Sequence, residues 1–171
     1  MVILRRTRKL ANVLPVSATP GAHSDTALGD WYVNRLIVDR RPLLLFVTAR
    51  GLLPTLLPAR DVAGLPRRLA DVASARLRRL GIAQSVIDAE VAAMSPVAVD
   101  ATIDRSVVGI MVDFAKMTPY VLERGAWDDS TLAFVEARLA RTPCHAGKRL
   151  EDVVFPDRKA PELLLVRWGA G

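Results

Sequence analysis

The chain of 171 residues contains one cysteine, Cys144, and only 5% of its residues are aromatic. A single cysteine excludes an intramolecular disulfide. No apolar run approaches the roughly 20 residues of a membrane-spanning helix, and the first residues lack the charged, apolar and small-residue segments of a signal peptide. We therefore expect a cytoplasmic protein with no membrane partner.

The sequence also lacks the motifs of the best-marked enzyme classes. It has no Gly-x-Ser-x-Gly elbow, no Walker A loop and no Gly-x-Gly-x-x-Gly fingerprint. Cys144 and His145 are adjacent, but neighbouring side chains on an extended segment point to opposite faces, so such pairs rarely act as nucleophile and base. With His23 as the only other histidine, a zinc site would need carboxylates to complete it. We predict no metal site and no cofactor.

Positive charge is concentrated near the N-terminus. The net charge is +6, and residues 1–60 carry nine Lys or Arg against three Asp or Glu. The densest cluster, which could steer nucleic acid, is Arg5, Arg6, Arg8 and Lys9. Arginine-rich, lysine-poor usage runs through the whole chain, however, and this favours a solvated basic surface over a nucleic-acid site.

Segments rich in β-branched and aromatic residues predict strands at 2–4, 31–38, 43–48 and 97–103, with 163–168 as a candidate last strand. The short connector at 39–42 favours a hairpin between the second and third strands. The run at 43–47 is apolar without alternation, which is typical of a central strand covered on both faces. Residues 7–14 suggest a brief helix, and Pro54 and Pro58 suggest turns.

Apolar spacing predicts helices at 66–81, 84–94, 104–123 and 130–141. The first two form an αα-hairpin. The second carries Asp88 and Glu90 and no Lys or Arg, which argues against a DNA-reading helix. The predicted fold is a single α+β domain over residues 1–171, with a small, largely antiparallel sheet covered by helices.

The long helix at 104–123 carries an apolar stripe and, on the opposite side, a polar stripe formed by Arg105, Gly109, Asp113 and Lys116. Asp104 is its predicted N-cap, and Asp104 and Asp113 lie roughly 14 Å apart along the axis, too far for one metal centre. Gly109 lies between Arg105 and Asp113, where its missing side chain would admit a ligand or allow close packing on a strand. The apolar stripe, which should be buried, contains Val107, Ile110, Met111, Phe114, Met117 and Val121.

A second candidate feature is the start of the strand at 31–38. Trp31 offers a broad stacking face and Asn34 a hydrogen-bonding amide, although a tryptophan at a strand start also serves as a packing anchor. We predict that both side chains lie within reach of the polar stripe on the long helix. The predicted ligand-binding residues are Trp31, Asn34, Arg105, Ser106 and Asp113.

Five motifs give the chain a family resemblance over roughly residues 2–145, which leaves 146–171 as a C-terminal extension. It resembles an uncharacterised family of small bacterial proteins, which implies an α+β domain and supplies no reaction or ligand. The family pattern has asparagines at the positions of Ala49 and Val112, which implies that part of any family site is altered here. The motifs are LRRTRKL at 4–10, DWxxN at 30–34, DRRxxLLF at 39–46, DRSVxG at 104–109 and TP at 142–143.

These observations leave three hypotheses of function. The first is a non-catalytic binding or regulatory module that binds a small molecule or a protein partner. The second is a hydrolase or transferase for an anionic substrate, with Arg105 holding the anion and Asp113 acting as general base. The third is a nucleic-acid-binding protein that uses the basic N-terminal region.

Overall fold

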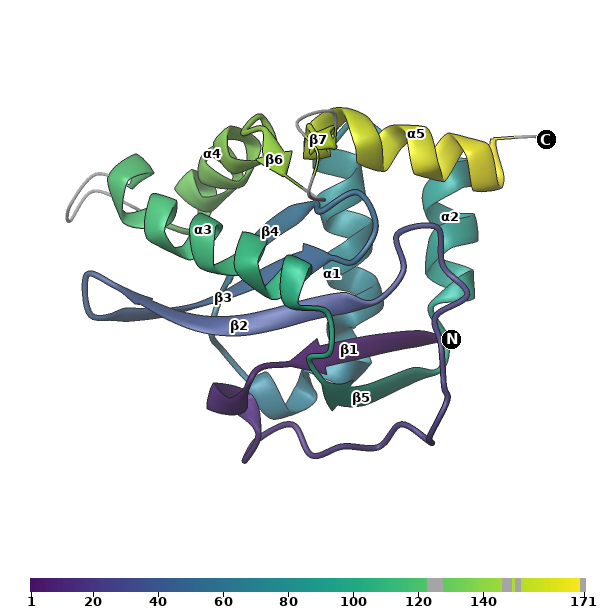
Figure 1. The fold of residues 1–171 in the computed structure, drawn as a ribbon, viewed down its shortest axis with the longest axis horizontal. Coiled ribbons are helices and arrows are strands. Elements are labelled where there is room, and N and C mark those ends of the chain that lie inside the picture. Colours follow the sequence, from purple (N-terminus) through teal and green to yellow (C-terminus); the bar gives the residue numbers. More distant parts are fainter. Residues whose placement is uncertain (123–127, 146–148, 150–151, 170–171) are drawn as a thin grey trace.

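The computed structural model describes residues 1–122, 128–145, 149 and 152–169. Its main sheet has the strand order β4-β3-β2-β1-β5 (Figure 1). β1 is parallel to both of its neighbours, whereas β2, β3 and β4 are antiparallel. The α+β prediction is confirmed, and the sheet is mixed. The strands are β1 (Val2–Arg6), β2 (Trp31–Val38), β3 (Arg41–Thr48), β4 (Pro54–Pro58) and β5 (Val97–Ala101).

Helices cover both faces of this sheet. α3 and α4 cover one face, and α3 crosses β2 and β3 (Figure 1). α1, α2 and α5 pack into the core on the other face. A two-stranded sheet joins β6 (Cys144–His145) to β7 (Val153–Val154). The helices are α1 (Leu65–Arg79), α2 (Gln84–Ala93), α3 (Arg105–Val121), α4 (Asp129–Ala140) and α5 (Pro156–Trp168).

Strand alternation divides the core into two layers. Trp31 and Val33 pack on the α1 side, while Tyr32 packs on the α3 side. β3 sends Leu44 to the first layer and Leu45 to the second, as expected for a central strand. The apolar stripe of α3 is buried through Val107, Ile110, Met111 and Phe114.

The hairpin between β2 and β3 matches the prediction. Val38 pairs with Arg41, which leaves Asp39 and Arg40 as a two-residue turn. Their φ angles are +49° and +63°, the combination that a type I′ turn requires.

Three segments differ from the sequence prediction. Residues 163–168 belong to α5 and form no strand, because a helix that begins at Pro156 buries Ala160 and Leu164 four residues apart. Residues 54–58 form β4 and not a pair of turns. β4 is an edge strand, where proline is tolerated because one side of the strand makes no ladder hydrogen bonds. The predicted helix at 7–14 is reduced to one 3₁₀ turn, Arg8–Leu10.

Both edges of the sheet form hydrogen bonds with other segments. On β4, the Leu56 N–H donates to Glu136 Oε2 on α4 at 3.0 Å. On β5, the Val99 carbonyl accepts from the Ser17 N–H at 2.9 Å. These contacts occupy backbone groups that would otherwise invite pairing with another chain.

α5 lies in the predicted C-terminal extension and is nevertheless part of the core. The Trp168 indole donates to Glu90 Oε2 on α2 at 2.7 Å, and Glu90 is fully buried. The turn between β3 and β4 approaches α5 so closely that a Cβ at Gly51 would lie 3.2 Å from the Ala160 backbone. Gly51 also has a φ of +78°, which favours glycine on conformational grounds.

Candidate functional site

Two of the five predicted ligand-binding residues lie in structural positions. Trp31 is completely buried and meets Phe46 edge to face, with ring centroids 6.2 Å apart. It lies on the opposite face of the sheet from α3, so the prediction that it reaches the polar stripe is wrong. The half-buried Asn34 faces the α3 side, where its Oδ1 accepts from Thr7 Oγ1 at 2.7 Å. Asn34 therefore joins β2 to the segment that follows β1.

The N-terminus of α3 is held by its cap and by the sheet. Asp104 Oδ1 accepts from the Ser106 N–H at 2.8 Å, which confirms the predicted N-cap. The Asp104 N–H donates to the Tyr32 hydroxyl at 3.2 Å. Burial raises the pKa of Tyr32, because the phenolate loses hydration in this position. Tyr32, one residue after Trp31, is thus the aromatic residue that contacts the long helix.

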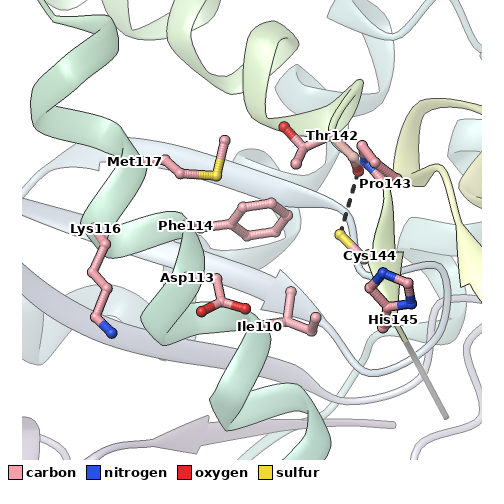
Figure 2. Close-up of a pocket in the computed structure, with 9 residues that line it drawn as sticks. All are labelled: Ile110, Asp113, Phe114, Lys116, Met117, Thr142, Pro143, Cys144 and His145. Atoms are coloured by element: carbon pink, nitrogen blue, oxygen red, sulfur yellow. Dashed lines mark hydrogen bonds between the residues drawn. The ribbon is translucent and has the colours of Figure 1, made fainter. Parts of the chain in front are cut away.

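A cavity lies between α3 and the segment that leads into β6 (Figure 2). Its volume is about 420 Å³, and we call it the α3–β6 cavity. Apolar side chains supply most of its surface: Ile110, Phe114, Met117 and Pro143. The polar residues in its wall are Asp113, Lys116, Thr142, Cys144 and His145.

Asp113 and Cys144 come from different elements and face the same cavity. The Cys144 thiol points towards the ring of Phe114 and donates to the Thr142 carbonyl at 3.4 Å (Figure 2). Burial, reinforced by the negative charge of Asp113, raises the pKa of Cys144 to about 11. At neutral pH the sulfur is therefore a protonated thiol, which is a poor nucleophile.

A second cavity of about 260 Å³ lies on the same side of α3, nearer its N-terminus. We call it the α3–α5 cavity. Ser106 and Ile110 border it from α3, Arg50 from the turn after β3, and Lys159 from α5. Ile110 also borders the α3–β6 cavity, so the two cavities adjoin at this residue.

The remaining predicted residues are exposed on α3. Arg105 is exposed and borders neither of the two cavities. A Cβ at Gly109 would meet nothing within 4 Å. No strand therefore packs against this glycine, which faces open space. Arg105 and Asp113 are eight residues apart, roughly 12 Å along the axis, which separates the anion holder from the base in the enzyme hypothesis.

The basic N-terminal cluster does not form one surface. The Arg5 side chain is 7% exposed, and its guanidinium contacts Asp30 at 2.6 Å and Asp100 at 3.0 Å. Arg6 is half-buried and donates from Nε to the Leu14 carbonyl at 3.1 Å. Of the four predicted nucleic-acid-binding residues, Arg8 and Lys9 are exposed. Fewer cationic side chains are therefore available to contact phosphate groups than the sequence suggests.

The sequence predicts Asp113 as a ligand-binding residue but does not predict its neighbours across the cavity. The adjacency of Cys144 and His145 suggests a nucleophile and base pair or a zinc ligand set, neither of which the sequence favours, whereas the structure places both residues in a cavity wall with Asp113. Within the part of the chain that the structure describes, no group of three or more His, Cys, Asp or Glu residues is arranged to hold a metal ion. Over the same residues, no helix combines the length and apolarity needed to cross a bilayer.

The comparisons with known proteins give a family and no activity. No curated protein and no solved structure shows significant similarity to the chain. The model of the domain of unknown function DUF6933 matches residues 3–159, which extends past the expected limit at residue 145 and includes the start of α5. The chain therefore belongs to the DUF6933 family of domains of unknown function.

Proposed function

We propose that this protein is a binding module that holds a small, largely apolar molecule in the α3–β6 cavity. The observation that carries the proposal is the cavity itself, with its volume of about 420 Å³ and its mainly apolar wall. Small-molecule sites are typically concave and apolar, with a few polar groups that fix orientation. Asp113 and His145 are such groups, and they come from segments far apart in the sequence.

The chemistry of the cavity favours binding over catalysis. A thiol whose pKa is raised to about 11 is not an activated nucleophile. The anion holder and general base of the enzyme hypothesis, Arg105 and Asp113, do not border a common cavity. The binding hypothesis needs only shape and polarity, which the α3–β6 cavity supplies.

The proposal is tested by NMR titration with the neutral probes octanol, p-cresol and indole. A Met117→Trp variant fills the cavity, because Met117 is half-buried in its wall. A Val112→Trp variant is the matched control, since Val112 is 43% exposed on the same helix and borders neither cavity. Thermal unfolding of each variant shows whether the fold is kept.

We expect at least one probe to shift amide signals at 110–117 and 142–145 in the wild type. Met117→Trp should weaken that binding roughly tenfold or more, a change of about 1.4 kcal/mol, while Val112→Trp should leave it unchanged. Failure of all probes to bind, or equal binding by both variants, would overturn the proposal.

A further inference from the structure

The two cavities beside α3 differ in charge. The α3–β6 cavity is bordered by the carboxylate of Asp113, and the ammonium of Lys116 is directed away from Cys144 and His145 (Figure 2). The α3–α5 cavity is bordered by two cations, Arg50 and Lys159. The groove they form along α3 therefore has a mainly apolar end, which carries Asp113 and Lys116, and a basic end.

Asp104 also borders the α3–α5 cavity and offsets one of its two cations, which leaves a net positive charge among the three side chains. Its carboxylate is oriented by hydrogen bonds from the Ser106 and Val107 N–H groups at the start of α3. Lys159 contacts Glu162 at 2.8 Å in an exposed pair, with side chains 40% and 59% exposed. Exposed pairs of this kind contribute little and exchange readily for another anion.

The dimensions of the groove fit one ligand that spans both cavities. Ser106 marks the basic end on α3 and Asp113 the apolar end. Their separation of seven positions in the sequence corresponds to roughly 10 Å along the helix axis. Ile110 borders both cavities between these positions, so it provides an apolar surface along which a chain or ring can pass.

We infer that the ligand of this groove is an anionic amphiphile, a molecule with an apolar body and a carboxylate or phosphate head. The body lies in the α3–β6 cavity, and the head is bound by Arg50 and Lys159. A guanidinium matches the geometry of either head with two parallel hydrogen bonds. Asp113 repels the head from the far end and so fixes the direction of the ligand. This inference rests on the proposed function and adds the chemical class of the ligand.

The test compares probes that share one apolar body, namely octanoate, octyl phosphate and octanol. Arg50→Gln/Lys159→Gln removes the two cations from the basic end. Arg67→Gln/Lys9→Gln is the matched control, because it lowers the net charge equally at exposed residues that border neither cavity. Affinities are measured by NMR titration at low and high salt.

We expect the wild type and the control variant to bind at least one anionic probe roughly tenfold more tightly than octanol. Arg50→Gln/Lys159→Gln should remove this preference and leave octanol binding unchanged, and high salt should reduce the preference. The comparison of octanoate with octyl phosphate identifies the preferred head. Equal binding of the anionic probes and octanol to the wild type would overturn the inference while preserving the proposed function. Absence of binding by every probe would overturn both.

Discussion

Asp113 on α3 faces Cys144 on β6 across the α3–β6 cavity, and its charge opposes ionisation of the Cys144 thiol. Burial is the larger cause of the raised pKa, and the carboxylate adds to it. This relationship links a predicted site residue to one that sequence reasoning had set aside. Because the chain has a single cysteine, Cys144 also reports on the cavity without interference from other thiols.

The first prediction concerns the reactivity of this thiol. Iodoacetamide reacts with the thiolate, so the alkylation rate of Cys144 should keep rising with pH towards a midpoint near the pKa of about 11. Asp113→Asn should lower the midpoint, but not to the ordinary value of 9.0, because burial remains. Glu162→Gln, on the exposed side of α5, should leave the midpoint unchanged. A midpoint near 9.0 in the wild type would contradict the assigned environment.

The second prediction concerns stability at alkaline pH. The folded thiol has the higher pKa, so above about pH 9 the unfolded chain ionises first and is favoured. The stabilising contribution of the protonated thiol is therefore complete below pH 9 and is lost as the pH rises towards 11. Urea unfolding should show a smaller loss between pH 8 and pH 10.5 for Cys144→Ala than for the wild type. Parallel curves for the two proteins would exclude this linkage.

The third prediction separates structure from nucleic-acid binding at the N-terminus. Arg5→Met should lower the free energy of unfolding by about 3 kcal/mol, because it leaves Asp30 and Asp100 without their buried partner. Arg8→Gln, at an exposed position, should change stability by less than about 0.5 kcal/mol. Chemical denaturation measures both values. Salt-sensitive DNA or RNA binding that Arg8→Gln weakens would revive the nucleic-acid hypothesis.

The fourth prediction concerns the attachment of α5. Glu90 accepts hydrogen bonds from the Ala27 and Leu28 N–H groups and from the Trp168 indole. Glu90→Gln would place an amide donor against one of these donors and should cost about 2 kcal/mol. Asp88→Asn, at an exposed position on the same helix, is the matched control. Equal stability of the two variants would show that Glu90 does not anchor α5.

The helices could be predicted from local sequence signals, namely residues that start helices and the spacing of apolar residues. Pro66 and Asp104 mark the helix starts, and periodic apolar residues place α1 to α4 within two residues of their observed bounds. The segment 163–168 was misassigned because its short apolar run has no distinguishable period. The deciding signal, Pro156 with Ala160 and Leu164 at helical spacing, lies mostly upstream of that run.

The candidate site could be predicted only in part, because it depends on contacts between distant segments. Alternation along β2 requires Trp31 and Tyr32 to face opposite layers, but the sequence does not reveal which layer α3 covers. Two of the predicted ligand-binding residues, Asp113 and Ser106, border the cavities beside α3. Their partners in the cavity walls, Cys144 and Arg50, carry no local signal that links them to α3.

Protection of Cys144 from alkylation shows whether the α3–β6 cavity holds a ligand. The rate of iodoacetamide alkylation is measured at pH 9.5 with and without a saturating amount of the neutral probe that binds best, with a short cysteine peptide as the reference for the reagent. We predict that the probe slows alkylation of Cys144 at least fivefold, because it fills the space beside the sulfur. The alkylation rate of the reference peptide should not change. An unchanged alkylation rate of Cys144 at saturation would place the bound probe elsewhere and contradict ligand binding in the α3–β6 cavity.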